Sequence, residues 1–387
     1  MPRAVNQSGF HCIAKDGNRR NNTPTGSIPI QRIQASLYRI PTDFPESDGT
    51  LEWNSTTLVV VRVHAGDEVG LGYTYADTAT AALVHDSLAK ILEGRDAMAT
   101  TACWNAMVGR TRNLGRPGIV SMAISAVDAA LWDLKARLLN LPLVTLLGAV
   151  RPAVPVYGSG GFTSYSDRQL QNQLRGWVER GIPRVKMKIG RDAADDLRRV
   201  RAARKAIGRD TELFVDANGA YSRKQALAQP QIFANFGVTW FEEPVSSDDL
   251  AGLRLMRDRA PGGVEIAAGE YGYDLTYFRR MLAAEAVDVM QADATRCGGI
   301  TGFLQVAALC QAFHVPLSAH CAPALHTHVC CAATPVRHVE YFHDHVRIER
   351  MFFDGMRPPV NGELKPDLSR PGMGLELKHA DAQRFAA

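Results

Sequence analysis

Hydrophobic and polar positions follow two different periods in the first part of this chain. Residues 29–40 (PIQRIQASLYRI) and 56–66 (TTLVVVRVHAG) alternate between apolar and polar side chains, which predicts two β-strands. Between residues 79 and 147 the apolar residues recur at spacings of three and four, which predicts amphipathic helices. We therefore expect an α+β unit over residues 28–150, in which the polar stretch 41–55 is a loop.

After Pro152 the pattern changes to short apolar runs separated by helical stretches. Eight such runs predict strands at 154–160, 184–190, 212–219, 239–244, 265–270, 287–293, 315–320 and 338–342. An open doubly wound sheet is the alternative, but no GxGxxG follows the first strand. The expected fold class is therefore α/β, a modified (β/α)7β-type TIM barrel over residues 151–358 with the α+β unit as a capping domain. Residues 359–387 are expected to return toward the cap, and residues 1–27 to be a poorly ordered leader.

Composition narrows the class of protein. With 46% hydrophobic residues, 22% charged residues and a net charge of +4, the chain is typical of globular proteins and has no basic run suited to nucleic acid. No apolar run approaches a membrane-spanning length, and the first 27 residues lack the apolar core of a secretory signal. The seven scattered cysteines form no CxxC pair, which favours reduced thiols. We expect a cytoplasmic protein without nucleic-acid or membrane partners.

Charged or strongly polar residues end almost every predicted barrel strand. Successive strand ends lie 20 to 28 residues apart, about one βα unit, so they should converge on the mouth of the barrel. One such carboxylate alone is more often a helix cap, and Glu-Glu-Pro alone is a plausible loop start. Helix capping does not explain a set of residues that includes lysine and histidine and recurs with the βα repeat. Its members are Lys186, Lys188, Asp216, Asn218, Glu242, Glu243, Glu270, Asp293, His320 and Glu340.

The types of these residues indicate the chemistry. Asp216, Glu242 and Glu270 would repel one another without a cation, and an all-oxygen donor set favours Mg²⁺, with Mn²⁺ as the alternative. Lys186 and Lys188 lie two apart on one strand and should face the same way, so that each lowers the pKa of the other. A lysine of lowered pKa is a competent general base.

The last two predicted catalytic groups lie on the far side of the barrel. Asp293 and His320 end successive strands, where a carboxylate can fix the tautomer of an imidazole. A lysine and a histidine on opposite walls, with a metal between them, suit removal of a proton next to a carboxylate. The metal would stabilise the second negative charge that this removal creates.

At this point the motifs resemble a known family. VKMKIG (185–190), VDANGAY (215–221), WFEEP (240–244), AAGE (267–270), QAD (291–293) and SAH (318–320) resemble the mandelate racemase subgroup of the enolase superfamily. The helix AISAVDAALWDLKARLLNLPLVTLLG (123–148) resembles that family's stretch from cap to barrel, and the likeness covers residues 28–387.

The resemblance implies a role for each matching position. Asp216, Glu242 and Glu270 would bind the metal, Lys188 would be the base on one face, and His320, oriented by Asp293, the acid or base on the other. Lys186 would lower the pKa of Lys188 and touch the substrate carboxylate, Asn218 would contact the substrate, and Glu340 would hydrogen-bond the enolate oxygen. His338, His343, Asp344 and His345 compete with Glu340 for that role. Arg296 stands where mandelate racemase has a lysine, which changes the substrate pocket.

Two further groups have alternative interpretations. Trp53, with the acidic residues around it, belongs to a loop that closes over the site in this family and would contact substrate, although a plain solvated loop is the alternative. His326 and His328 lie beside Cys330 and Cys331, but we expect them on the helix after the seventh strand rather than in a second metal site.

The expected reaction is dehydration of an acid sugar, a small carboxylate substrate, in a homo-oligomeric enzyme. The polar cap loop suits a polyhydroxy substrate, and most members of the family with this residue set are such dehydratases. Racemisation or epimerisation of a 2-hydroxy acid uses the same two bases, and cycloisomerisation of a lactone is the third alternative. A non-catalytic binding barrel is the remote alternative, since every proposed catalytic position is filled.

Overall fold

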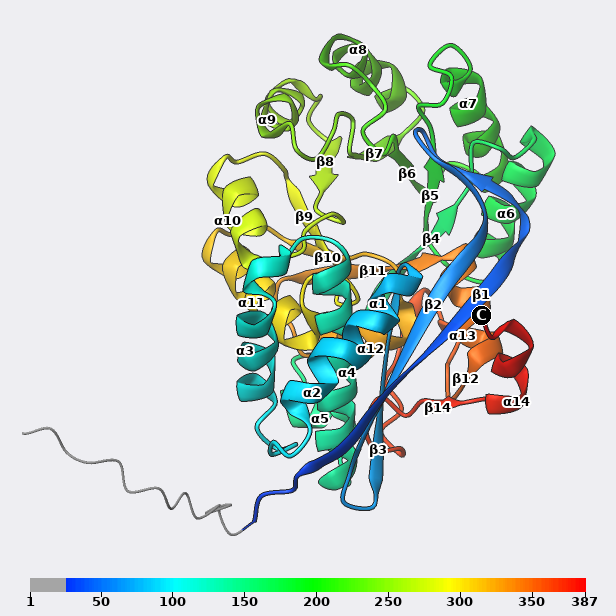
Figure 1. The fold of residues 1–387 in the computed structure, drawn as a ribbon. Coiled ribbons are helices and arrows are strands. Elements are labelled where there is room, and N and C mark those ends of the chain that lie inside the picture. The colour runs from blue at the N-terminus through cyan, green and yellow to red at the C-terminus, as the bar shows by residue number, and fades with distance from the viewer. Residues whose placement is uncertain (1–25) are drawn as a thin grey trace, which may run out of the picture.

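The computed structural model describes residues 26–387, so the predicted leader, 1–27, lies almost wholly outside the described residues. Two assemblies make up the described chain: an N-terminal antiparallel sheet with helices, and a closed parallel barrel (Figure 1).

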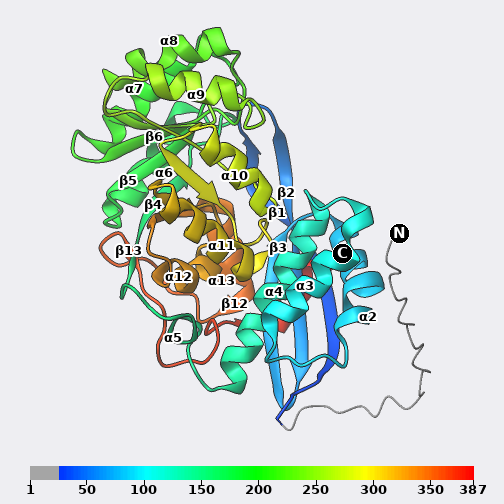
Figure 2. The ribbon, with the colours of Figure 1, turned by 90° about the vertical axis from the view of Figure 1, so that its left-hand side faces the viewer.

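The N-terminal sheet has the order β1-β2-β3 and is antiparallel throughout. Gly70 and Gly72 let the long helix α4 pack directly on β3, because a Cβ at Gly72 would lie 2.1 Å from the Ala126 carbonyl oxygen. Helix α4 also lies against the barrel helix α11 (Figure 2). The elements are β1 (Ile30–Ser47), β2 (Glu52–Ala65), β3 (Glu68–Tyr75), α1 (Thr78–Leu83), a π-helical turn (Val84–Leu88), α2 (Ala89–Leu92), α3 (Thr100–Arg110), α4 (Ile119–Leu138) and α5 (Leu143–Leu147).

Eight parallel strands form the barrel, which closes where β11 pairs with β4, Val339 opposite Val156. Every predicted strand segment overlaps one of these strands, and the predicted barrel with a cap is confirmed. The strands are β4 (Val154–Gly160), β5 (Arg184–Lys188), β6 (Glu212–Asp216), β7 (Val238–Glu242), β8 (Glu265–Ala268), β9 (Val289–Ala292), β10 (Leu317–Ala319) and β11 (Val336–Phe342). A short strand, β13 (Glu363–Leu364), adds antiparallel to β4.

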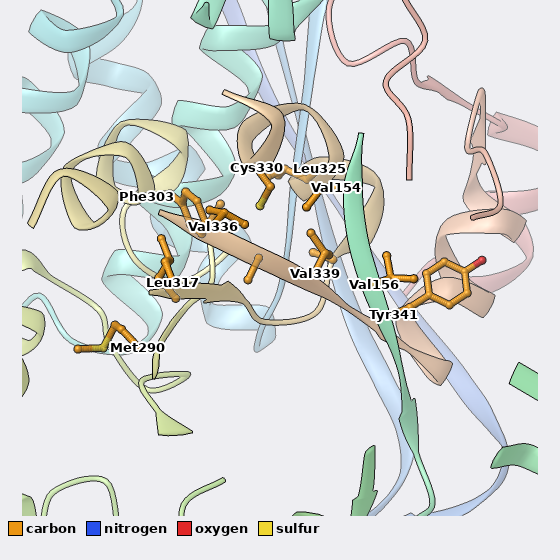
Figure 3. Close-up of a cluster of buried hydrophobic side chains, with 14 of the residues drawn as sticks. Val154, Val156, Met290, Phe303, Leu317, Leu325, Cys330, Val336, Val339 and Tyr341 are labelled. Atoms are coloured by element: carbon orange, nitrogen blue, oxygen red, sulfur yellow. The ribbon is translucent and has the colours of Figure 1, made fainter. Parts of the chain in front are cut away.

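Helices surround the barrel and cover the outward-facing strand residues. Figure 3 shows Val336 and Val339 of β11 together with Leu325 and Cys330 of α12 and Phe303 of α11. A fully buried apolar side chain contributes roughly 1.5–3 kcal/mol, so this layer fixes the positions of the strand ends. The helices are α6 (Asp167–Glu179), α7 (Asp196–Ile207), α8 (Arg223–Ala234), α9 (Leu250–Arg259), α10 (Leu275–Ala283), α11 (Gly299–Ala312), α12 (Pro323–Cys331) and α13 (His343–Phe352).

Aromatic side chains fill the inside of the barrel below the strand ends. Tyr157, Phe214 and Trp240 pack there in one buried cluster. Because side chains alternate along a strand, Phe214 and Trp240 lie on the same face as Asp216 and Glu242, two residues further on. The apolar cluster therefore forms a floor beneath the charged groups, and the Trp240 indole nitrogen donates to Glu242 Oε2 at 3.0 Å.

The stretch 41–55 is not the loop that we expected. Strands β1 and β2 continue through most of it, with Pro41 opposite Ser55 and Glu46 opposite Trp53, and turn at 48–51. The prolines at 41 and 45 are tolerated because β1 is an edge strand and its pairing is irregular between Pro41 and Glu46. This hairpin reaches across to the barrel near α6 and α7 (Figure 1), where the Thr163 N–H donates to the Ser47 carbonyl at 2.8 Å.

The chain after α13 contacts the N-terminal sheet and α4. It contains β12 (Phe353–Asp354), β14 (Glu376–Leu377) and α14 (His379–Ala382). Arg137 of α4 donates to the Glu376 carboxylate at 2.6 Å, and the Ala387 N–H donates to the Leu37 carbonyl at 3.2 Å. The bounds 28–150, 151–358 and 359–387 remain predictions. Among the described helices none has the length and apolar character needed to cross a membrane.

Candidate active site

The end of β5 brings two lysines into a buried cluster of carboxylates. Lys186 Nζ lies 2.6 Å from Glu242 Oε1, 2.8 Å from Glu340 Oε1 and 3.2 Å from Asp216 Oδ2. Lys188 Nζ lies 2.6 Å from the same Asp216 oxygen. Strands β5, β6 and β7 are neighbours in the barrel and β11 closes it, so the topology itself assembles this cluster.

The opposite wall carries a histidine held between two carboxylates. His320 Nδ1 lies 2.9 Å from Asp293 Oδ2, and His320 Nε2 lies 2.8 Å from Glu270 Oε2. Asp293 is itself fixed, because its Oδ1 accepts from the backbone N–H and the hydroxyl of Thr295, each at 2.7 Å. The imidazole therefore has one nitrogen oriented by Asp293 and the other directed toward the centre of the site.

Glu340 is the member of its segment that joins the cluster. Besides Lys186, it contacts the Ser159 hydroxyl and accepts from the Cys321 N–H at 3.1 Å. Two of its competitors lie elsewhere: His338 packs in the aromatic floor with Tyr157, and His343 pairs with Asp43 outside the barrel. Asp344 binds Arg347 and Thr56, while His345 lines the cavity and stacks on Tyr75 with ring centroids 3.5 Å apart.

Burial and mutual charge set the pKa values of these groups. Burial raises the pKa of Glu242 to about 8, with Asp216 as the next cause. Burial has the largest effect on the pKa of Lys188 and lowers it, but Asp216, 2.6 Å away, together with Glu270 and Glu242, holds this pKa above its usual range. Lys186 lowers it, as expected. The expected net lowering depends on a metal ion beside these carboxylates and stays a prediction.

The charges of the site do not balance among the described residues. Six buried carboxylates face the three fixed cations Lys186, Lys188 and Arg296, with His320 as a fourth only when it is protonated. With all six ionised, two or three negative charges would be uncompensated, and the raised pKa values of Glu242 and Glu243 reflect this excess together with burial. The six are Asp216, Glu242, Glu243, Glu270, Asp293 and Glu340.

This deficit suits a divalent cation. Glu243 Oε1 is buried and has no hydrogen-bond partner among the described residues, and burial together with Glu270 raises the Glu243 pKa well above its usual range. Carboxylate oxygens are the ligands that Mg²⁺ and Mn²⁺ accept, and the residues present fit such an ion. Asp216, Glu242 and Glu270 could hold it.

A cavity of about 530 Å³ opens between the strand ends and the cap. Lys188, Asn218, Arg296 and His320 line it from the barrel, and Trp53 lines it from the hairpin. Asn218 Oδ1 is buried without a hydrogen-bond partner among the described residues, so it remains available to a ligand.

The other two expected substrate contacts are constrained by protein groups. Arg296 Nη1 donates to the Glu270 carbonyl at 3.1 Å, and the guanidinium lies over Tyr271. The Trp53 indole nitrogen donates to Glu46 Oε2 at 2.9 Å, so this ring presents its apolar faces rather than its N–H.

Several residues that line the site were not predicted from the sequence. Cys321, next to His320, places its Sγ 3.3 Å from His320 Nε2. Ser55 and Thr57 reach the cavity from β2. The signal for Cys321 is its position immediately after a predicted site residue. Glu243 belongs to the predicted set of strand-end residues but has no predicted role, and it lines an adjoining cavity. The cap residues have no comparable local signal.

His326 and His328 lie on α12, as expected, and both bind backbone groups. His326 Nε2 accepts from the Ala294 N–H at 2.9 Å, and His328 Nδ1 accepts from the Val144 N–H at 3.3 Å. Burial lowers the pKa of His328 to about 4. These two side chains stabilise the loop after β9 and the start of α5.

Comparison with known proteins identifies the family. Residues 42–148 match the family model for the mandelate racemase / muconate lactonizing enzyme N-terminal domain, and residues 169–382 match the enolase C-terminal domain-like model. A mandelate racemase/muconate lactonizing enzyme-like protein from Rubrobacter xylanophilus has a similar crystal structure, with a TM-score of 0.91 and 56% identity over 93% of this chain and 100% of that chain.

Two relatives with assigned activities are more distant. A 3,6-anhydro-alpha-L-galactonate cycloisomerase from Streptomyces coelicolor is 36% identical over 92% of this chain and 99% of its own length. An L-talarate/galactarate dehydratase from Salmonella typhimurium is 31% identical over 85% of each chain. A variant of an L-talarate/galactarate dehydratase with Mg and L-glucarate bound has a TM-score of 0.86 and 27% identity over 98% of this chain and 97% of that chain. The chain therefore belongs to the enolase superfamily, in the group of mandelate racemase and muconate lactonizing enzyme.

Proposed function

We propose that this chain is a Mg²⁺-dependent acid-sugar dehydratase. The observation that carries the proposal is the placement of a lysine and an Asp293-oriented histidine on opposite sides of one carboxylate cluster, under a cavity closed by a polar hairpin. Relatives that dehydrate L-talarate, galactarate and arabinonate support this reaction class.

Asp216, Glu242 and Glu270 would hold the metal ion. When bound, Mg²⁺ would stabilise negative charge on the oxygens of the substrate carboxylate. The magnesium in the solved dehydratase relative supports this choice of ion, and Mn²⁺ remains the alternative. Lys186, between Glu242 and Glu340, would help to neutralise the same carboxylate, and Asn218 would bind a substrate oxygen.

The protein side chains would move the protons. Lys188 Nζ would take the proton from C2, and the electrons of the C–H bond would move into the C1–C2 bond of the enolate. Protonated His320 Nε2 would then give its proton to the C3 hydroxyl, which leaves as water. The resulting enol becomes a 2-keto-3-deoxy acid. Glu340, when it carries a proton, would donate a hydrogen bond to the enolate oxygen, while Arg296 and Trp53 would shape the pocket.

Cycloisomerisation is the second candidate, because the cycloisomerase relative is 36% identical over nearly its whole length. In that reaction a base on one side of the site, Lys188 or His320, would remove a proton. A ring oxygen of the substrate would then leave in place of hydroxide. Racemisation or epimerisation at C2 would use both walls equivalently.

The decisive experiment is a screen of C5 and C6 sugar acids with the Mg²⁺-loaded enzyme. Formation of a 2-keto product supports the dehydratase. Acids inverted only at C2 would replace it with a racemase or epimerase, and ring-opened or rearranged lactones with a cycloisomerase. A barrel that neither turns over nor exchanges the C2 proton with deuterated water would not be an enzyme for these acids.

A further inference from the structure

The active-site cavity has two ends of different character. The barrel end contains the lysines, the carboxylate cluster and His320. The other end, here called the cap end, is formed by Ser55 and Thr57 of β2 and by Asp77 after β3, where the Ala76 N–H donates to the Thr57 carbonyl at 3.2 Å. Trp53, Ser55 and Thr57 alternate along β2 and therefore share one face of that strand.

The cap end carries negative but no positive charge. Asp77 is its ionisable side chain among the described residues that line the cavity, and it is acidic. Asp77 caps helix α1, accepting from the Ala79 N–H at 2.9 Å, and it is exposed. Asp48 also lines the cavity, but it lies in the hairpin turn on the barrel side, where the Thr163 hydroxyl donates to its carbonyl at 2.7 Å.

The cations that line this cavity belong to the barrel end. Lys188 pairs with Asp216. Arg296 lies between the Glu270 carbonyl and Asp293, whose Oδ2 is 3.7 Å from Arg296 Nε. Both cations are thus paired with barrel groups, and among the described residues the cap contributes no cation to the cavity lining. A second anionic group on a ligand would therefore find no unpaired counter-charge at the cap end.

His345 lies between the two ends but brings no charge. Its ring stacks on Tyr75, and its Nδ1 accepts from the Ala322 N–H at 3.3 Å, which requires the unprotonated nitrogen. Burial also lowers the pKa of His345 to about 3, so the ring is neutral at working pH.

Charge complementarity then distinguishes between two classes of sugar acid. An aldonic acid carries one terminal carboxylate, whereas an aldaric acid carries a second carboxylate at the far end. A carboxylate beside Asp77 is repelled, whereas hydroxyl groups can donate to the Asp77 carboxylate and exchange hydrogen bonds with Ser55 and Thr57. The Trp53 ring offers an apolar face to C–H groups.

We propose that the substrate has a single carboxylate, bound at the barrel end, and an uncharged hydroxyl-bearing tail at the cap end: an aldonic rather than an aldaric acid. The orientation rests on the proposed function, which puts the carboxylate at the metal ligands and Lys186.

Matched pairs of acids test this directly. Each pair, such as gluconate with glucarate, galactonate with galactarate, and mannonate with mannarate, differs only in oxidation at C6. We expect kcat/KM for keto-product formation to be at least about tenfold higher for the aldonic member of every pair turned over. Equal or higher values for the aldaric members would overturn the inference.

A binding assay separates this inference from the proposed reaction. The Mg²⁺-loaded Lys188→Ala variant is titrated with the same pairs by calorimetry, so that no turnover is needed. Tighter aldonic binding without any keto product from the wild type would refute dehydration and leave the single-carboxylate inference standing. Tighter binding of the aldaric acids by the variant, together with keto product from the wild type, would refute the single-carboxylate inference and leave dehydration standing.

Two variants test the cap end itself. Ser55→Arg adds a cation there, and it should move the aldaric-to-aldonic ratio of kcat/KM toward the diacid by at least about tenfold relative to Ser55→Gln. Asp77→Asn keeps the helix-capping oxygen and should move the ratio in the same direction, whereas Asp86→Asn, exposed and outside the cavity, should not. An unchanged ratio in a folded Ser55→Arg protein and in Asp77→Asn would show that the tail does not bind at the cap end.

Discussion

Lys188 and His320 contact different partners, and under the proposed function this difference would give them different tasks. Lys188 Nζ faces one carboxylate, Asp216, whereas His320 lies between Asp293 and Glu270. An imidazole with one nitrogen held by a buried carboxylate keeps its other nitrogen aimed at the reacting groups in either protonation state. We therefore assign C2 proton removal to Lys188 and delivery of a proton to the leaving hydroxide to His320.

This assignment predicts that elimination and proton exchange can be separated. His320→Asn should abolish the 2-keto-3-deoxy product, because hydroxide leaves poorly without a proton. The same variant should still exchange the C2 proton with deuterated water, while Lys188→Ala should lose both, by about 10²-fold or more. Product is measured as keto acid and exchange by proton NMR. Retained exchange in Lys188→Ala, together with its loss in His320→Asn, would reverse the two roles.

Asp293 is a positioning residue in this scheme, because it acts on the substrate through His320. Asp293→Asn should lower kcat by about 10²–10⁴-fold with little change in KM, since an amide can favour the wrong imidazole tautomer. Thr295→Val is the matched control: it removes one of two bonds to Asp293 Oδ1 and leaves the backbone N–H bond. C2 proton exchange should survive in Asp293→Asn. A parallel fall of exchange and elimination would place Asp293 in proton removal as well.

The sequence predicts which polar residues end the strands, but it misses a neighbour that the backbone turns inward. Lys186, Asp216, Glu242 and Glu270 follow from the strand repeat and meet in one cluster. Cys321 was missed because strict alternation directs it away from the site. Its φ angle, +53°, breaks the alternation and brings its Sγ beside His320 Nε2.

At the scale of elements, the barrel was predictable and the hairpin was not. Barrel strands are short apolar runs whose burial is local information, so all eight could be placed from the pattern. The stretch 41–55 contains prolines, Asp48 and Gly49, residues that are typical of loops. Its extended conformation comes from pairing between β1 and β2 and from contact with the barrel, where Ser47 and Thr163 hydroxyls lie 2.6 Å apart.

Glu46 predicts an unusual pH dependence for this hairpin. Burial, followed by the charge of Asp344, raises the pKa of Glu46 to about 9, although Trp53 donates a hydrogen bond to it. An acid whose pKa is higher in the folded state keeps its proton between the unfolded and folded pKa values. It therefore stabilises the fold at low pH and loses that contribution as pH rises toward about 9.

Glu46→Gln should remove this dependence. Between pH 5 and 9 the free energy of unfolding of the wild type should fall relative to that of the variant, by as much as ~1.4 kcal/mol per pH unit. Glutamine still accepts the Trp53 N–H, so the comparison isolates the ionisation. Urea unfolding of both proteins across this pH range measures it. Parallel stability curves would mean that Glu46 is not protonated in the folded state.

At the scale of the whole molecule, the cap supports the loop that carries the histidine's partner. Asp128 of α4 accepts from the N–H of Thr301 at 2.8 Å and from its hydroxyl at 2.7 Å. The Thr74 hydroxyl on β3 donates to the Thr295 carbonyl at 2.7 Å. Thr295 in turn binds Asp293, so the cap and the barrel are joined beside the catalytic histidine. Sequence patterns do not reveal contacts between segments more than 170 residues apart.

Asp128→Ala should therefore destabilise the protein and weaken the site together. Loss of a buried acceptor leaves the Thr301 N–H and hydroxyl unpaired, which costs about 1–3 kcal/mol. Asp86→Ala, at an exposed position on the cap, should stay within about 0.5 kcal/mol of the wild type. Urea unfolding gives the first effect, and kcat of the folded variant should fall while C2 exchange persists. A destabilised variant with unchanged kcat would show that the cap does not position Asp293.

Metal removal should affect the stability of the entire barrel as well as activity. Without a cation, the carboxylates at the ends of β6, β7 and β8 carry uncompensated charge in a buried site, so the folded state loses stabilisation that bound Mg²⁺ would provide. At a free Mg²⁺ concentration 100 times Kd, that contribution is about 2.7 kcal/mol, so excess chelator should lower Tm and abolish activity, and Mg²⁺ should restore both.

Glu270→Gln should bind the ion more weakly, and its Tm should respond less to added Mg²⁺. Exposed Glu285→Gln is the matched control and should respond as the wild type does. Full activity after verified metal removal, or equal Mg²⁺ responses of Tm in Glu270→Gln and the wild type, would refute the assignment of Asp216, Glu242 and Glu270 as metal ligands.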